Sequence, residues 1–126
     1  MIEYELIKRG AVFEVRAVRQ LRAEVAIVIK YLHDLEESER KKLVKEIIRF
    51  ADHGPHPNRE KFRSFKGHAN LFEIKASQGR ILLFFAGEGI AVLTHGFTKK
   101  RNATPQSEID RALRLRDLYE KTFGEW

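Results

Sequence analysis

The alternation of apolar and polar residues predicts a hairpin of two strands at the start of the chain. From Glu3 to Val18, apolar side chains recur at about every second position on either side of Lys8-Arg9-Gly10. This spacing turns alternate side chains to one face of a strand, and glycine allows the backbone of a tight turn. We therefore expect two short antiparallel strands joined near Gly10.

Two helical stripes follow the hairpin. From Leu21 to Leu35 the apolar residues are spaced by four and three positions, which is the spacing of one helix face. The run from Val25 to Ile29 also fits a strand, and the length of the stripe favours the helix.

The second stripe begins after Ser38 and continues to about His53. Gly54-Pro55 ends it, because glycine accepts a left-handed conformation and proline cannot continue a helix. Joined through Glu36-Glu37, the two helices are expected to form an antiparallel pair that covers one face of a sheet.

Three further strands are predicted in the second half of the chain, at Leu71–Ala76, Arg80–Ala86 and Ile90–Thr98. Ser77–Gly79 and Gly87–Gly89 are short glycine turns, so the strands should form an antiparallel meander. The middle strand is apolar at nearly every position, and it should be central with both faces buried.

The last predicted element is a helix from Pro105 to about Phe123. Thr104 is expected to cap its first turn, with Pro105 in the first helical position. Opposite charges four residues apart, at Asp110–Arg114 and Asp117–Lys121, favour this helix. Its buried side should contain Ile109, Ala112, Leu113 and Leu118, and cations should come from Arg111, Arg114 and Arg116.

Length and composition indicate one domain over residues 1–126, because 126 residues, 43% of them apolar, suffice for one hydrophobic core. Without cysteine, disulfides and thiolate metal sites are excluded. The first residues lack the basic and apolar regions of a signal peptide, and no apolar run approaches the roughly 20 residues that span a bilayer. We expect a soluble cytoplasmic protein that does not associate with a membrane.

The formal net charge is +6, from 24 Lys and Arg against 18 Asp and Glu. This balance favours polyanionic partners such as RNA, DNA or an acidic protein, although many basic domains bind no nucleic acid. One segment interleaves cations with aromatic rings, as in surfaces that bind phosphates and stack on bases: Lys61, Phe62, Arg63, Phe65 and Lys66. The alternative is that Phe62 and Phe65 are buried and anchor a loop to the core.

The sequence contains no metal-binding or phosphate-loop motif. The five histidines are scattered, and His53 and His56 are separated by Gly54-Pro55, which breaks helical geometry. Glycine-rich phosphate loops, serine nucleophile elbows and cysteine nucleophiles are also absent. We expect neither a metal nor a cofactor.

Cations and one histidine remain as candidates for chemistry. A meander brings several of them toward one edge of the sheet: Lys66, Lys75, Arg80, His95, Lys99, Lys100 and Arg101. Cations without carboxylates suit the binding and cleavage of a phosphodiester. RNA supplies its own nucleophile, the 2′-hydroxyl, so no metal-activated water is required.

The proton carrier in such a site has two candidate types. His95 is the natural choice near neutral pH, unless it is a strand-end histidine that bonds to a backbone carbonyl. A lysine can serve only where burial or neighbouring cations lower its pKa.

Several motifs occur together in the second half of the chain. They are Phe65-Lys66-Gly67, Leu71-Phe72-Glu73-Ile74-Lys75, Gly79-Arg80-Ile81-Leu82, Leu93-Thr94-His95-Gly96-Phe97-Thr98-Lys99-Lys100 and Thr104-Pro105-Gln106-Ser107-Glu108-Ile109. In this combination, over roughly Leu21 to Tyr119, the sequence resembles toxins of the RelE/ParE superfamily, specifically the HigB-like, phage Gp49-related branch of type II toxin–antitoxin systems.

The resemblance implies an α+β, RelE-like fold, with two N-terminal helices packed on a small, mainly antiparallel sheet, plus a C-terminal helix. It implies a ribosome-dependent mRNA endoribonuclease that acts in the ribosomal A site without a metal. The implied partner is a cognate antitoxin, often a helix-turn-helix DNA-binding protein, and the implied assemblies are a homodimer or a toxin–antitoxin heterotetramer.

The residues and the resemblance together identify the candidate site. We expect catalytic roles for Lys66, Arg80, His95, Lys99 and Lys100. We expect RNA contacts from Lys61, Arg63, Phe65, Lys75, Phe97 and Arg101. Several RelE-like nucleases have a tyrosine near the last catalytic cation, but this sequence has Ile109 there and the nearest tyrosine is Tyr119. Stacking on the substrate base then falls to Phe97 or Phe65.

Two other functions remain open. One is a non-catalytic inhibitor that binds DNA gyrase, as ParE relatives do. The other is a phage-derived protein that only binds its antitoxin.

Overall fold

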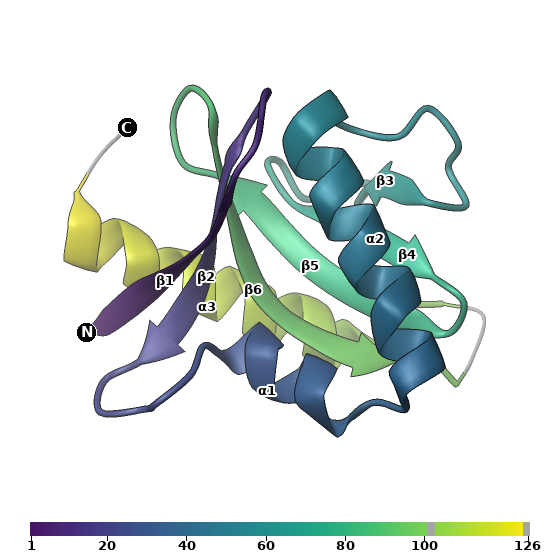
Figure 1. Ribbon diagram of the computed structural model, residues 1–126. Helices are drawn as coiled ribbons and strands as arrows, with labels where there is room; N and C mark the ends of the chain where they lie inside the picture. The colour runs from purple at the N-terminus through teal and green to yellow at the C-terminus, as the bar shows by residue number, and fades with distance from the viewer. Residues whose placement is uncertain (101–102, 125–126) are drawn as a thin grey trace.

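The computed structural model describes residues 1–100 and 103–124. Within these residues the chain forms one six-stranded sheet and three helices (Figure 1). The strands are β1 (Ile2–Arg9), β2 (Glu14–Gln20), β3 (Phe62–Ser64), β4 (Phe72–Ala76), β5 (Gly79–Phe85) and β6 (Ile90–Thr98). The helices are α1 (Ile27–Asp34), α2 (Glu37–His53) and α3 (Gln106–Phe123).

The sheet has the order β1-β2-β6-β5-β4-β3. Both predicted antiparallel units are confirmed, the β1–β2 hairpin and the β4–β5–β6 meander. A parallel contact between β2 and β6 joins them, and the short strand β3 beside β4 was not predicted. The expected architecture is therefore correct as an α+β, mainly antiparallel fold, but the hairpin precedes the helices, so these are not the N-terminal elements.

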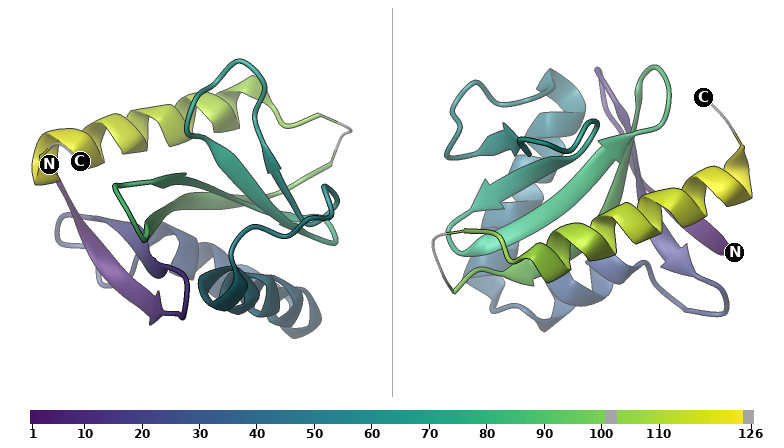
Figure 2. Two further views of the ribbon diagram at one scale, coloured as in Figure 1. Left: turned by 90° about the horizontal axis from the view of Figure 1, so that it is seen from above. Right: turned by 180° about the vertical axis from the view of Figure 1, so that it is seen from behind.

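The helices lie on both faces of the sheet (Figure 2). One core, between the sheet and α1 and α2, includes Val28, Leu43 and Leu83. The other face packs against α3 through two smaller apolar clusters, which include Phe84 and Tyr119 in one and Leu82 in the other. Strand β5 is buried on both faces, as its apolar sequence predicts.

Helix α1 is shorter than its apolar stripe suggested. Strand β2 continues to Gln20, and the chain then turns at Arg22, which has a positive φ of 68°. Leu21 and Val25 are consequently exposed, at 51% and 39%. The expected antiparallel helix pair is also wrong, because α2 rises steeply away from α1 (Figure 1), with α1 packed on β6 and β2 and α2 on β4.

The ends of the longer helices were predicted with mixed success. Helix α2 ends as expected at Gly54, which has a φ of 81° and donates its N–H to Phe50 O. Helix α3 has no side-chain cap, because the Thr104 hydroxyl bonds to Glu73 instead. Its buried residues are Ile109, Ala112, Leu115 and Tyr119, so Leu113 and Leu118 are only partly buried. The expected Asp117–Lys121 pair forms at 2.9 Å, whereas Asp110 accepts a hydrogen bond from Gln106.

A bulge in β6 changes which face its side chains occupy. Leu93 pairs with Leu83 and His95 with Leu82, so Thr94 is one extra residue. Before it, Leu93 packs into the core under α1 and α2. After it, His95 and Phe97 face α3 instead. The Thr94 hydroxyl stabilises the bulge by donating to Leu82 O, at 3.1 Å.

Gly96 is required because α1 approaches β6 very closely. A Cβ atom at this position would lie 2.3 Å from Cδ2 of Tyr31. We expect Gly96→Ala to lower the free energy of unfolding by about 1–3 kcal/mol, the usual cost of overpacking a close contact. Urea unfolding provides the measurement, and Tyr31→Ala is the matched background. An equal loss in that background, where the ring is absent, would contradict this explanation.

Candidate functional site

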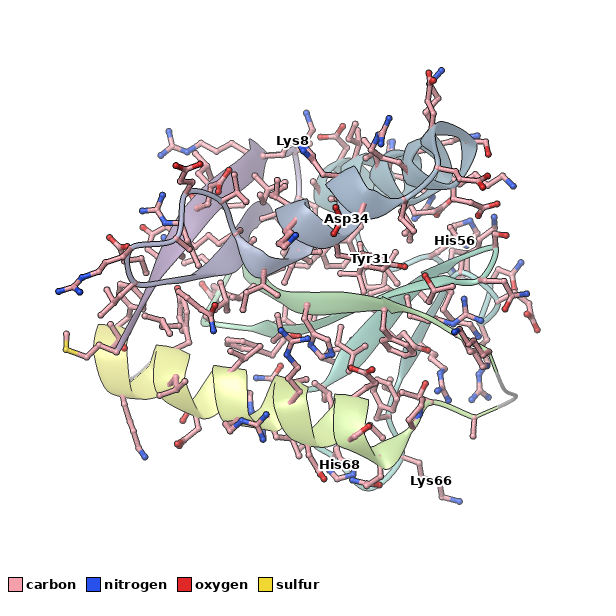
Figure 3. The ribbon with its side chains drawn as sticks, turned by 90° about the horizontal axis from the view of Figure 1, so that it is seen from below. Lys8, Tyr31, Asp34, His56, Lys66 and His68 are labelled. Carbon is pink, nitrogen blue, oxygen red and sulfur yellow. The ribbon has the colours of Figure 1, made fainter. Side chains whose placement is uncertain are left out.

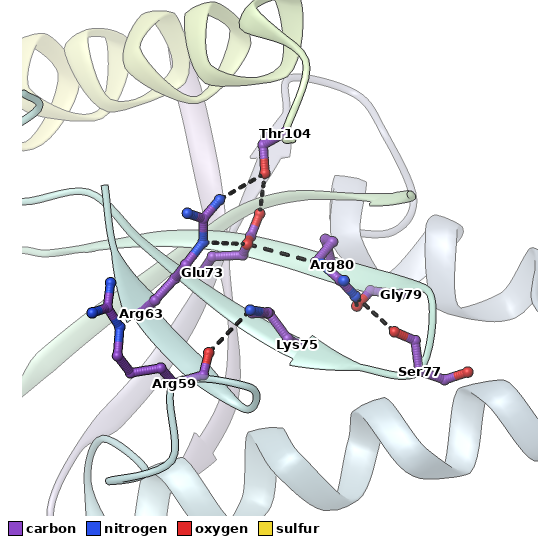
Figure 4. Close-up of polar contacts among 8 residues, drawn as sticks. All are labelled: Arg59, Arg63, Glu73, Lys75, Ser77, Gly79, Arg80 and Thr104. Atoms are coloured by element: carbon purple, nitrogen blue, oxygen red, sulfur yellow. Dashed lines mark hydrogen bonds and ion pairs between the residues drawn. The ribbon is translucent and has the colours of Figure 1, made fainter. Parts of the chain in front are cut away.

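Four charged side chains gather on the α3 side of the sheet. Glu73 and Lys75 are two residues apart on β4 and therefore share a face. Arg63 of β3 pairs with Glu73, and Arg80 of β5 pairs with Lys75. Because directly paired residues project to the same face, strand pairing brings these groups together. With Thr104, which precedes α3, they form what we call the Glu73 cluster (Figure 4).

The Glu73 carboxylate lies at the centre of this cluster and is fully buried. Arg63 Nε donates to Glu73 Oε1 at 3.0 Å, and the Thr104 hydroxyl donates to Oε2 at 2.9 Å. Arg63 Nη2 also donates to Thr104 Oγ1, at 3.1 Å, which closes a ring of three contacts. A buried carboxylate is stable only with such partners, so these bonds explain why Glu73 is tolerated there.

Arg80 is the second buried charge, with 7% of its surface exposed. Its Nη1 donates to two carbonyls of the β4–β5 turn, Ser77 O at 2.8 Å and Gly79 O at 2.9 Å. Its Nε lies 3.9 Å from Glu73 Oε1 and has no hydrogen-bond partner among the described residues. Arg80 is therefore held rigidly and acts on its surroundings through its charge.

Lys75 is the cation of the cluster with the most altered acidity. Its Nζ donates to Arg59 O at 3.0 Å. Partial burial lowers the pKa of Lys75, and the positive charges of Arg63 and Arg80 lower it further, against the opposing effect of Glu60 and Glu73. Burial and the neighbouring cations therefore shift Lys75 in the direction that favours its neutral amine.

The cluster as a whole is cationic. Arg63, Lys75 and Arg80 provide three positive charges against the one carboxylate of Glu73. Arg63 keeps 29% of its side chain exposed, and Lys75 is half-buried at the surface. This arrangement can bind a phosphodiester, stabilise charge that develops on it, and exchange a proton with it.

His95 does not belong to this surface. The side chain is fully buried, with Nε2 3.0 Å from Glu108 Oε1 and Nδ1 3.1 Å from Thr94 Oγ1. Burial lowers the pKa of His95, and the nearby cation Arg111 lowers it further, against the opposing effect of Glu108. His95 thus has a structural place, as the alternative expected, but its ring bonds to the side chains of Thr94 and Glu108 rather than to a backbone carbonyl. The bond to Glu108 joins β6 to α3.

This lowered pKa makes stability depend on pH. In the unfolded chain His95 titrates near 6.5. Between the lower folded pKa and that value the unfolded state binds more protons, so the free energy of unfolding falls as the pH is lowered through this window. We expect wild type to lose more stability than His95→Gln between about pH 7.5 and pH 5, measured by urea unfolding. Equal losses would assign the pH dependence to other groups.

The remaining predicted residues lie outside the cluster. Phe65 is 7% exposed and packs with Leu71 and Ile109, so the expectation of an exposed stacking ring is wrong and the anchoring alternative holds. Lys66 points into solvent from the loop after β3 (Figure 3). Phe97 pairs with Arg80 and is partly buried against α3.

The predicted cations after β6 lie at the end of the meander. The Lys99 N–H donates to Gln78 O at 2.7 Å, which places this residue beside the β4–β5 turn. Lys100 is exposed, and Arg101 lies outside the described residues. Lys61 is half-buried, with Nζ 3.8 Å from Glu46 Oε2.

Sequence reasoning missed the acidic and hydroxyl partners of the cations. Glu73 was detectable, since it shares the strand face of Lys75 by period-two spacing. The role of Thr104 was hidden by its suitability as a helix cap, and that of Glu108 by its distance in sequence from His95.

No group of three or more His, Cys, Asp or Glu side chains among the described residues is arranged to hold a metal ion. None of the described helices has the length and apolar character needed to cross a membrane.

Comparison with known proteins identifies the family. Residues 30–117 match the sequence model of a family described as phage derived protein Gp49-like (DUF891). The chain belongs to this family. Gp49-like proteins are RelE/HigB-like toxins, so the resemblance noted in the sequence is confirmed. The matched region runs from α1 into α3 and contains the whole Glu73 cluster, whereas β1 and β2 precede it.

A solved structure supports the fold of this Gp49-like protein. It is described as a crystal structure of an archaeal RelE-RelB complex from Pyrococcus horikoshii OT3, with a TM-score of 0.50 and 10% sequence identity. The alignment covers 60% of this chain and 89% of that chain. At this identity the likeness concerns the fold. No curated protein matches the sequence.

Proposed function

We propose that this Gp49-like protein is the toxin of a type II toxin–antitoxin pair and that it cleaves mRNA on the ribosome without a metal. The observation that carries the proposal is the Glu73 cluster, in which three cations lie near one buried carboxylate and two of them, Arg63 and Lys75, are partly exposed. Family membership supports the toxin role.

The proposed reaction is attack of an RNA 2′-oxygen on the adjacent phosphorus atom. The 2′-hydroxyl gives its proton to the neutral amine of Lys75, the new O–P bond forms, and the bond to the 5′-oxygen breaks. That oxygen takes up a proton from water, leaving a 2′,3′-cyclic phosphate and a 5′-hydroxyl. Arg63, which keeps 29% of its side chain exposed, stabilises the charge that builds on the phosphate oxygens, and the buried Arg80 contributes through its charge alone.

Within this proposal the predicted residues have different roles. Arg80 lowers the pKa of Lys75 and holds the β4–β5 turn. Lys99 and Lys100 provide further positive charge at the end of β6. His95, being buried, is a positioning residue that fixes α3 against the sheet.

The proposed partners follow from the same function. The similar solved structure is a complex of RelE with RelB, and we propose that a cognate antitoxin likewise binds this chain. A helix-turn-helix antitoxin in a heterotetramer, with action at the ribosomal A site in the cytoplasm, completes the proposal.

The test is brief induced expression followed by mapping of mRNA 5′ ends, with and without assembled ribosomes. We expect cuts within translated codons that require ribosomes, and their absence in Arg63→Gln. Lys8→Gln, a half-buried lysine on β1 away from the cluster, is the matched control. Growth arrest with intact mRNA and DNA damage would instead indicate a gyrase inhibitor, and expression without growth arrest would indicate a protein that only binds its antitoxin.

A further inference from the structure

A second group of cations lies across the β4–β5 turn from the Glu73 cluster. Lys42 and Lys45 of α2, Lys61 before β3 and Ser77 of the turn line a cavity of about 110 Å³, together with Glu46 and Ala76. Lys42 and Lys45 have no part in the chemistry proposed above. The sequence alone does not predict that Lys42 and Lys45 lie near Lys61. They belong to α2, which packs on the face of β4 opposite the Glu73 cluster.

The charges around this cavity favour an anion. Lys61 Nζ lies 3.8 Å from Glu46 Oε2, beyond hydrogen-bond distance, and Lys42 Nζ lies 3.5 Å from Glu39 Oε1. Lys45 forms none of the ion pairs found among the described residues. Three ammonium groups thus face two carboxylates, and the side chains of Lys42 and Lys61 remain 55% and 42% exposed.

Two hydrogen bonds link the walls of the cavity directly to the Glu73 cluster. The N–H of Lys75 donates to Lys61 O at 2.9 Å, and Arg80 Nη1 donates to Ser77 O at 2.8 Å. Figure 4 shows Ser77 in the turn between Arg80 and α2. The cavity and the Glu73 cluster are therefore neighbours that share the β4–β5 turn.

We propose that this cavity is a phosphate-binding subsite for the RNA backbone, beyond the phosphodiester that is cleaved. The inference rests on the proposed function. Lys42, Lys45 and Lys61 contact the phosphate oxygens, and the Ser77 hydroxyl is placed to donate to one of them. The subsite fixes the path of the strand over the β4–β5 turn, so that the scissile phosphate stays beside Lys75.

The experiment measures binding of a fluorescent single-stranded RNA oligonucleotide over a series of KCl concentrations. The test variant is K42Q/K45Q/K61Q. The control, K8Q/K30Q/K41Q, removes the same charge, and two of its lysines are already paired, Lys30 with Asp34 and Lys41 with Glu37. Because each phosphate contact on a single strand contributes about 0.7 to the slope of log K against log salt, we expect the slope to fall by about 1–2 in the test variant and by much less in the control.

The outcomes separate this inference from the proposed function. Equal slopes in both triple variants, with weaker binding by Arg63→Gln, would overturn the subsite and leave the nuclease proposal standing. Wild-type protein that neither binds RNA nor cuts mRNA would overturn both. Loss of antitoxin binding in the test variant, with RNA binding like that of the control, would make this surface a protein interface and also overturn the subsite. Thermal unfolding of all variants checks that the fold is retained.

Discussion

Replacing Lys75 with methionine is expected to lower the rate of mRNA cleavage by about 10²–10⁴-fold, the usual contribution of one acid or base group. Methionine keeps an apolar stem of similar length, and the half-buried position should accept it. The loss therefore reports the amine rather than the packing. Single-turnover cleavage of mRNA on programmed ribosomes is the measurement.

Lys75→Arg distinguishes proton transfer from charge alone. Arginine keeps the positive charge but does not deprotonate in a protein. If Lys75 accepts the proton, the arginine variant is nearly as slow as the methionine variant. In wild type the rate should also rise with pH through the lowered pKa of Lys75, as the neutral amine is formed. An arginine variant as fast as wild type would show that this residue only neutralises phosphate.

Glu73→Ala is expected to destabilise the fold by about 3–5 kcal/mol, the usual cost of removing one partner from a buried charge pair. Arg63 and Thr104 lose their shared acceptor, and the buried Arg80 guanidinium loses its nearest opposite charge. Urea unfolding gives the change in free energy.

The control is the exposed Glu88 in the β5–β6 turn, where alanine should change stability by less than about 0.5 kcal/mol. Arg63→Met combined with Glu73→Ala should cost less than the sum of the two single changes, because the pair is removed together. Additive losses, or a Glu73→Ala variant as stable as wild type, would contradict the central role of the carboxylate.

Local sequence patterns predict most of the fold. The bounds of β6 and the centre of the meander follow from apolar runs between glycine turns, which are local signals. The start of helix α1 was predicted too early because Leu21 and Val25 match a helical stripe by spacing, whereas the chain up to Gln20 belongs to the sheet. The pairing of β2 with β6 joins residues about 75 positions apart, and no local pattern encodes it.

The candidate site was predicted only in part, for physical reasons. Lys75 and Arg80 flank a short turn, so hairpin geometry brings them together. The burial of His95 depends on the Thr94 bulge and on Glu108 of a helix that begins eight residues after β6 ends. The lowered pKa of Lys75 depends on burial and then on Arg63, which lies on the unpredicted strand β3.

The extra residue at Thr94 constrains how this chain can evolve. Before Thr94 and after it, odd-numbered side chains of β6 point to opposite faces of the sheet. Deleting Thr94 would therefore turn His95 and Phe97 toward α1 and bring Gly96 toward α3. A substitution in this stretch changes the contacts of one side chain, whereas a one-residue deletion moves every following side chain of β6 to the other face of the sheet. Relatives that keep this site should therefore align through β6 without insertions or deletions, and a gap placed there would mark either a misalignment or a lineage that has lost the site.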